Sequence, residues 1–104
     1  MSKRDYESEE LTVAESRARL KKPPLFKVLL HNDDFTTMEF VVFVLMDVFG
    51  HIEASAVRIM LNVDTQGQGV AGVYTYEVAE TKAERAAQLA RAHEYPLLCT
   101  VEEE

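Results

Sequence analysis

The chain has 104 residues, 47% of them apolar, which allows one domain with one modest core and excludes wholesale disorder. Its formal net charge of −7 disfavours binding to nucleic-acid phosphates and favours a cationic ligand or a basic protein surface. No apolar run reaches the roughly 18–20 residues of a membrane span. The polar start of the chain lacks the apolar core of a signal peptide.

The first stretch, residues 1–22, is polar and dense in charge, with six Lys or Arg and five Asp or Glu. Residues 23–104 hold five Lys or Arg and thirteen Asp or Glu, so the acidic balance belongs to this later part. A short amphipathic pattern between Leu11 and Leu20 is compatible with a fragile helix, but the composition is more typical of a mobile tail. Because Pro23-Pro24 blocks helix continuation, we predict a flexible tail over 1–22 and a core domain over 23–104.

The first predicted element of the core domain is a strand over residues 26–31. Its alternation places Phe26, Val28 and Leu30 on one face. The run Asn32-Asp33-Asp34 follows directly, and because these residues prefer turns, we expect the strand to end there.

A helix is predicted after this acidic turn, over about 38–49. Thr36 and Glu39 have the spacing of a capping box, and Gly50 is suited to end the helix. Ten of the twelve residues over 38–49 are apolar, the exceptions being Glu39 and Asp47. A helix without a polar face is either covered on every side or presents apolar surface to a ligand. Beside the acidic turn, this surface suggests a ligand that is cationic at one point and apolar next to it.

Four further elements are predicted from helical spacing and from glycine and proline breaks. They are a helix over about 53–62, a strand over 70–77, a helix over 80–93 and a strand over 97–101, with a loop over 64–69. Gly72 suggests a bulge or a close backbone approach within its strand. Alanines give the last helix a small-residue face that can lie close on a sheet. The order β-α-α-β-α-β predicts a small single α+β domain, with a three-stranded antiparallel sheet covered by three helices on one face.

Few residues suggest catalysis. Gly67-Gln68-Gly69 is not followed by the Lys and Ser or Thr of a phosphate loop, and one cysteine with three scattered histidines gives no zinc spacing. Cys99 lies in an apolar run, which favours a buried inert thiol over a nucleophile. Because a single cysteine cannot form an internal disulfide, we expect the protein to reside in the reducing cytoplasm. Asp33 and Asp34 are either an acid–base pair, a magnesium site or turn-forming carboxylates, and without a nucleophile we favour the last.

The methionines at helical positions, Met38, Met46 and Met60, have two interpretations: core filler or ligand contact. Met38 differs from the others because it lies in the first helical turn, beside the acidic residues. The methionine side chain adapts to varied apolar shapes, which suits the gate of a pocket.

Three blocks of this sequence resemble the ClpS family, the adaptor of the bacterial Clp protease. The first runs from Pro23 to Val41 and contains Asn-Asp-Asp-Phe-Thr-Thr-Met-Glu-Phe. The second is Met60-Leu61-Asn62-Val63, with Gly67 after it. The third runs from Gly72 to Lys82, contains Glu-Val-Ala-Glu-Thr-Lys, and is completed by Pro-Leu-Leu-Cys-Thr at 96–100. The resemblance covers roughly residues 23–102.

The resemblance implies a non-enzymatic adaptor without a metal or a cofactor. Such proteins bind substrates that begin with Phe, Tyr, Trp or Leu, which are N-degrons, and deliver them to the AAA+ unfoldase ClpA for degradation by ClpP. Its implied partners are therefore N-degron proteins and the N-terminal domain of ClpA, with no nucleic acid and no membrane, and it acts as a monomer.

The resemblance also implies roles for particular residues. The contacts with the α-amino group fall on Asn32 and Asp33. The pocket for the first side chain falls on Thr36, Met38, Val41, Met60, Val63 and Leu97. The docking surface for the unfoldase includes Glu77, Thr81 and Lys82, and residues 1–22 are the segment used in delivery.

Two positions depart from the family pattern. Thr37 stands where the family often has Pro. Thr at this position is expected to loosen the turn slightly. Asp64 stands where the family usually has a His that contacts the amino end of the peptide. Asp64 is shorter but can accept a hydrogen bond from an ammonium, and beside Asp33 the two carboxylates would repel and raise one pKa.

We therefore predict that Asp64 alters peptide affinity or narrows first-residue specificity, with a sharper loss of binding at low pH. The alternative is a domain that docks on the unfoldase and modulates it, but has lost or narrowed N-degron binding.

Overall fold

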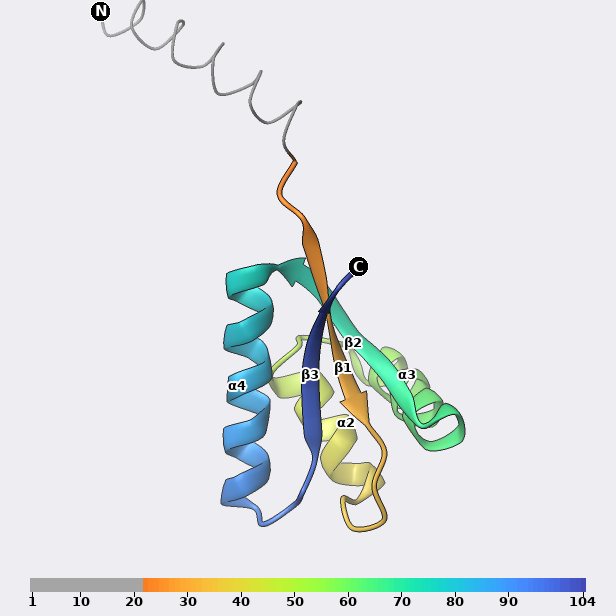
Figure 1. The fold of residues 1–104 in the computed structure, drawn as a ribbon. Helices are drawn as coiled ribbons and strands as arrows, with labels where there is room; N and C mark the ends of the chain where they lie inside the picture. Colours follow the sequence, from red (N-terminus) through yellow and green to blue (C-terminus); the bar gives the residue numbers. More distant parts are fainter. Residues whose placement is uncertain (1–21) are drawn as a thin grey trace, which may run out of the picture.

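The structure is a computed structural model that describes residues 22–104, so the tail predicted over 1–22 lies outside the described residues except for Lys22. The elements are β1 (Leu25–His31), α2 (Met38–Asp47), α3 (Glu53–Gln66), β2 (Gln68–Thr75), α4 (Tyr76–Ala92) and β3 (Leu98–Glu103). The antiparallel strands lie in the order β2-β1-β3, and the helices cover one face of the sheet (Figure 1). The predicted α+β class and element order are confirmed.

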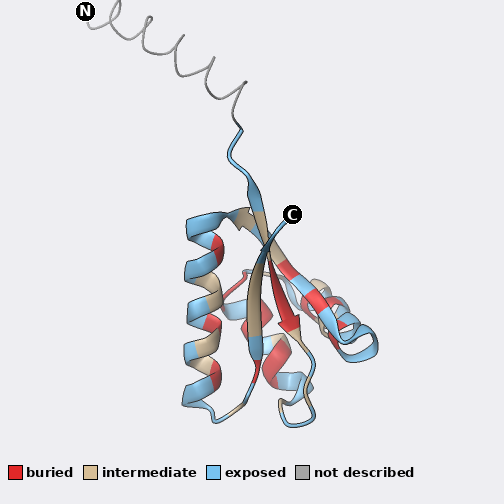
Figure 2. Cartoon of the chain, viewed as in Figure 1, coloured by how far each residue is buried: buried red, intermediate tan, exposed pale blue. Residues whose placement is uncertain are grey.

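The central strand β1 supplies the middle of the core. Val28 and Leu30 are fully buried and Phe26 packs against the same cluster, so the predicted alternation is confirmed. Figure 2 shows buried residues along β1 and on the side of α4 that faces the sheet. On the opposite face of β1, the Nε2 of His31 shares a hydrogen bond of 2.7 Å with the hydroxyl of Thr100 on β3. Because β1 is held between two strands, the turn that follows it starts from a rigid position.

The capping of α2 differs from the prediction. The N-cap is Thr37, whose Oγ1 accepts a hydrogen bond from the backbone N–H of Phe40 at 3.1 Å. The capping box predicted for Thr36 and Glu39 is therefore wrong, because the Thr36 hydroxyl donates to Asp33 instead. The Thr37 hydroxyl satisfies a backbone donor that the first turn of a helix leaves unpaired.

The apolar helix α2 is covered on its core side only. Phe40, Val44 and Leu45 are buried, whereas Met38, Phe43 and Met46 are 47%, 44% and 40% exposed. The helix therefore presents apolar surface to solvent, and its first turn does so beside the acidic residues. Past its end, Gly50 has φ 74°, as expected for the residue that terminates the helix.

Helix α3 is longer than predicted. It continues to Gln66 and ends at Gly67, whose φ of 89° is left-handed and whose N–H donates to the Val63 carbonyl at 3.0 Å. The loop predicted over 64–69 is therefore wrong: its first three residues belong to α3, Gln68 and Gly69 already belong to β2, and Gly67 alone joins the two elements. As a result, Asp64 lies in the last turn of α3 rather than in a loop.

The junction between β2 and α4 also lies earlier in the sequence than predicted. The strand predicted to reach Glu77 ends at Thr75, so Tyr76 and Glu77 form the start of α4. The expectation for Gly72 is confirmed: the register with β1 shifts beside it, and the ring of Tyr74 occupies the place that a side chain at Gly72 would need. The helix packs closely on the sheet through buried alanines, which are Ala79, Ala86 and Ala90. Among residues 22–104, no helix has both the length and the apolar character that a membrane crossing requires.

Candidate functional site

The acidic turn between β1 and α2 is organised by one carboxylate. Oδ1 of Asp33 accepts hydrogen bonds from the backbone N–H groups of Phe35 at 2.8 Å and Thr36 at 2.7 Å. Its Oδ2 accepts from the Thr36 hydroxyl, also at 2.7 Å. The sequence adopts this turn because an aspartate side chain can bond to backbone two and three residues ahead. Asp33 is thus held in one orientation before any ligand arrives.

The same hydrogen bonds keep Asp33 charged. Burial raises the pKa of Asp33, but the side-chain hydrogen bond from Thr36 and the backbone hydrogen bonds from Thr36 and Phe35 outweigh it, so the pKa lies below its ordinary value. A raised pKa expected from repulsion by Asp64 is therefore not observed at Asp33. The turn presents a fixed carboxylate anion at neutral pH.

A cavity of about 250 Å³ opens beside this turn. Its lining comes from the turn, from the start of α2 and from the last two turns of α3, and comprises Asn32, Asp33, Asp34, Thr36, Met38, Val41, Met60, Val63 and Asp64. The backbone N–H of Asn32 donates to the Gly67 carbonyl at 2.9 Å, which ties the turn to the end of α3. The cavity thus brings together segments that are about thirty residues apart in the sequence.

The cavity gathers all but one of the residues that the resemblance assigned to peptide binding. Leu97 is the exception: it is buried in the core cluster, to which Val41 and Val63 also belong, and it does not line the cavity. Asp34, which we considered above as part of an acid–base pair, a magnesium site or a turn, lines the cavity as well. The position of Asp34 within the Asn-Asp-Asp run was the sequence signal that could have indicated this role.

The cavity lining combines two kinds of chemistry. It includes the carboxylates of Asp33, Asp34 and Asp64 and the amide of Asn32, together with methionine and valine side chains. A ligand with an ammonium next to an apolar group would match both kinds of surface, because charge-assisted hydrogen bonds are the stronger ones and apolar burial is favourable. With a volume below the roughly 300–1,000 Å³ of pockets for drug-sized ligands, the cavity suits a single side chain.

Asp64 has an unusual electrostatic position. It lies in the last turn of α3, where the helix carries partial negative charge and no basic residue is present. A carboxylate there is unfavourable for the folded chain, whereas a cation bound in the cavity would offset it. This residue is therefore poised to favour a positively charged ligand.

The predicted docking residues gather on another surface. Glu77, Thr81 and Lys82 line a shallow depression of about 320 Å³ on the first turns of α4, with Val78 and Arg85. Lys82 also has a structural contact: its Nζ donates to the Val48 carbonyl at 3.0 Å. It thereby pairs with the carbonyl end of α2.

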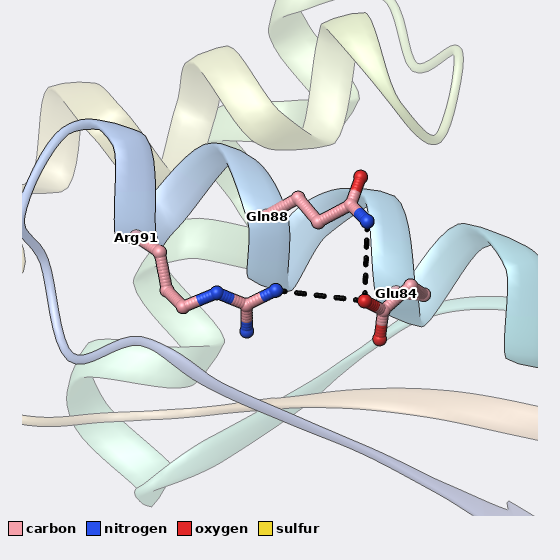
Figure 3. A network of polar contacts seen from close by, with 3 residues as sticks. All are labelled: Glu84, Gln88 and Arg91. Atoms are coloured by element: carbon pink, nitrogen blue, oxygen red, sulfur yellow. Dashed lines mark hydrogen bonds and ion pairs between the residues drawn. The ribbon is translucent and has the colours of Figure 1, made fainter.

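Farther along α4, the outer face is polar. Oε2 of Glu84 accepts from Gln88 Nε2 at 3.2 Å and pairs with Arg91 Nη2 at 3.5 Å (Figure 3). Both charged side chains are largely exposed, so this pair contributes little to stability. It lies on the solvated part of α4 beyond the depression lined by Glu77, Thr81 and Lys82.

Two other sequence expectations concern chemistry. Burial raises the pKa of the Cys99 thiol to about 11, which keeps it protonated and makes it a poor nucleophile. Within residues 22–104, no three histidine, cysteine, aspartate or glutamate side chains converge as a metal site would require.

The chain is similar to known proteins in both sequence and fold. Residues 21–100 match the family model described as the ATP-dependent Clp protease adaptor protein ClpS. The ATP-dependent Clp protease adapter protein ClpS of Hyphomonas neptunium is 56% identical over 90 residues, covering 86% of this chain and 76% of that protein. The protein of the same name in Myxococcus xanthus is 50% identical over 102 residues, covering 98% and 95%.

A solved structure is similar as well. Agrobacterium tumefaciens ClpS2 bound to L-phenylalaninamide superposes with a TM-score of 0.77 at 41% identity, covering 80% of this chain and all of that one. The family match, the extent of the sequence identity and the shared fold lead to one conclusion: this chain belongs to the ClpS family of adaptor proteins of the ATP-dependent Clp protease.

Proposed function

We propose that this adaptor recognises N-degrons that begin with Phe, Tyr, Trp or Leu and delivers them to the ClpA unfoldase. The observation that carries the proposal is that a fixed, ionised Asp33 and the apolar side chains of Met38 and Met60 line the same cavity. Only the first residue of a protein offers an ammonium beside its own side chain. The similar Agrobacterium protein is bound to L-phenylalaninamide, which has both groups, and this supports the proposal.

In the proposed complex the α-amino group binds Asn32, Asp33 and Asp64. The first side chain enters between Thr36, Met38, Val41, Met60 and Val63, with Leu97 supporting this wall from the core. Each charge-assisted hydrogen bond contributes about 1.5–3 kcal/mol, and burial of Leu or Phe about as much. After the cost of association, these terms are consistent with dissociation constants in the micromolar range.

Delivery needs a second surface and a segment that the unfoldase can engage. We propose the α4 depression at Glu77, Thr81 and Lys82 for docking to the N-terminal domain of ClpA, and residues 1–22 for delivery, with 23–104 as the adaptor core. The protein would act as a monomer in the cytoplasm, where a lone buried cysteine remains reduced.

A second candidate function rests on Asp64. If this carboxylate disturbs the site instead of binding the ammonium, the chain would dock on the unfoldase as a modulator with lost or narrowed N-degron binding. The two functions predict different results with peptides.

The test measures binding and delivery separately. Fluorescence anisotropy with otherwise identical peptides should show tight binding for Phe, Tyr, Trp and Leu at the first position and at least about tenfold weaker binding for Ala or Glu, a difference of about 1.4 kcal/mol. A Phe-initiated reporter should be degraded by ClpA and ClpP only when the adaptor is added. Equal affinities for all first residues, with ClpA binding intact, would instead favour the modulator.

A further inference from the structure

The three methionines within residues 22–104 differ in where they lie. Met38 and Met60 line the cavity beside the acidic turn, whereas Met46 does not, although it belongs to the same helix as Met38. Met38 and Met46 are similarly open to solvent, at 47% and 40% exposed, and Met60 is half-buried. A small solute can therefore reach Met38 and Met46 alike, but of these two only Met38 would carry a chemical change into the cavity.

We propose that Met38 is a site of reversible oxidation, at which a hydroperoxide weakens the binding of N-degrons. The sulfur attacks one oxygen of the hydroperoxide and the O–O bond breaks. The leaving oxygen takes the proton of the transferred one and departs as water or an alcohol. The thioether is oxidised by two electrons to a sulfoxide, and the peroxide is reduced. The inference rests on the proposed function and adds control of the same site.

The change can be reversed by a known class of enzyme. Methionine sulfoxide reductases return the sulfoxide to the thioether, one enzyme for each sulfoxide epimer. Two thiols supply the two electrons and end as a disulfide, and the oxygen leaves as water. Oxidation at Met38 would thus lower the affinity of the adaptor without destroying it.

The lining of the cavity makes it sensitive to a sulfoxide. Methionine sulfoxide is polar, and its oxygen requires a hydrogen-bond donor. Ionised carboxylates accept hydrogen bonds and do not donate them, so the three lining aspartates offer no partner in that form. The Thr36 hydroxyl already donates to Asp33. A sulfoxide at Met38 would therefore remain hydrated, which keeps water where the first side chain of an N-degron is proposed to bind.

The thiol of Cys99 is a poorer target for the same oxidant. Its side chain is only partly exposed, and burial raises its pKa to about 11. Hydroperoxides react with the thiolate, which is scarce at neutral pH in such a group. Among the sulfur-containing residues that line the cavity, Met38 is more exposed than Met60, so Met38 is the one that we expect to react first.

The experiment treats the full chain with hydrogen peroxide and measures two quantities on each quenched sample. Mass spectrometry of proteolytic fragments gives the sulfoxide fraction at every methionine, and fluorescence anisotropy gives the dissociation constant of a Phe-initiated peptide without sulfur. Met38 and Met46 should be oxidised before Met60. Full conversion of Met38 should weaken binding at least about fivefold, the lower end of the cost of burying a polar group without a partner. Both methionine sulfoxide reductases together, with a dithiol, should restore the affinity.

Two leucine variants assign the effect, each compared with its own untreated sample. The matched control, Met46→Leu, removes a similarly exposed thioether that does not line the cavity, and should lose affinity on oxidation as the unmodified chain does. Met38→Leu should stay within about twofold of its own untreated affinity. If Met38→Leu binds too weakly to measure, a time course on the unmodified chain shows whether the loss follows the sulfoxide fraction at Met38 or at Met46.

Three results would overturn the inference: full conversion of Met38 with unchanged or tighter binding, no oxidation of Met38 under conditions that convert Met46, or an undiminished loss in Met38→Leu. A loss that follows the sulfoxide fraction at Met46 would do the same. The oxidation of Met38 is measured without any peptide. If the untreated chain binds no Phe-initiated peptide, it is the proposed function that fails, and this inference fails with it.

Discussion

Substituting Asp33 by Asn separates charge from geometry at the acidic turn. The Asn oxygen can still accept the two backbone hydrogen bonds that Oδ1 of Asp33 accepts from Phe35 and Thr36, and the Thr36 hydroxyl can rotate to accept from the new amide. The turn should therefore persist, with a loss of about 1 kcal/mol in the free energy of unfolding. What disappears is the anion. A charge-assisted hydrogen bond to the peptide ammonium contributes about 1.5–3 kcal/mol, so Asp33→Asn should weaken binding by about 10- to 150-fold.

The assay is fluorescence anisotropy with a Phe-initiated peptide and its N-acetylated twin. Acetylation removes the ammonium, so Asp33→Asn should have little further effect on the acetylated peptide. Thermal unfolding should show a shift of about 4–8 °C for the 1 kcal/mol lost, which confirms that the variant folds. The reasoning is refuted if Asp33→Asn changes the affinity for the free peptide by less than about twofold, or weakens the free and acetylated peptides by the same factor.

The pH dependence follows from the same carboxylate. Because the folded-state pKa of Asp33 is lowered, its contribution to stability is present above the unfolded value and is lost as pH falls through the folded pKa, below 3.8. The loss of binding at low pH expected from the sequence should therefore not arise from Asp33 above pH 4. Affinity should stay level between about pH 5 and 7 and fall above about pH 8, where the peptide ammonium deprotonates. A steep loss between pH 7 and 5 in the unmodified chain would contradict this assignment.

Four further substitutions test other parts of the account. Asp64→Asn should raise the free energy of unfolding by about 0.3–1 kcal/mol, because it removes a negative charge from the end of α3. It should also weaken Phe-peptide binding. Denaturant titration measures the first effect and anisotropy the second, and unchanged binding would favour the modulator. Glu77→Lys should weaken binding to the N-terminal domain of ClpA, measured by calorimetry, and leave the peptide dissociation constant unchanged. Lys82→Glu should have the same effects and should also lower the melting temperature, because Lys82 donates a hydrogen bond to the Val48 carbonyl. Thr37→Ala should lower the free energy of unfolding by about 0.5–2 kcal/mol through loss of the α2 cap, and an unchanged denaturation midpoint would argue against that cap.

The order of elements and the core face of β1 were predictable because they depend on local patterns. Val28 and Leu30 alternate along a strand, and glycines and prolines separate the elements. The N-cap of α2 was not predictable from spacing alone, since Thr36 and Thr37 are adjacent and both are suitable caps. Tertiary geometry decides: Asp33 takes the Thr36 hydroxyl, which leaves Thr37 for the helix.

Predictions of helix and strand ends failed where the local composition favoured the wrong element. Polar residues after Val63 suggested a loop, but α3 continues until Gly67 provides the left-handed conformation that ends it. The β-prone run before α4 likewise masked the start of that helix at Tyr76.

The candidate site was accessible to sequence reasoning only in part. The pairing of an acidic turn with an exposed apolar helix predicted the kind of ligand, and the family resemblance supplied the individual residues. Leu97 could not be separated from the lining residues without knowing how β3 packs.

The most direct test of the central claim is a crystal structure of the chain with a Phe-initiated peptide. The account predicts the peptide nitrogen within about 2.7–3.2 Å of Oδ2 of Asp33, and the phenyl ring in the cavity beside Met38 and Met60. It also predicts that the carboxylate of Asp64 faces the ammonium. A peptide bound elsewhere, or bound with its ammonium in solvent and away from the acidic turn, would contradict the account.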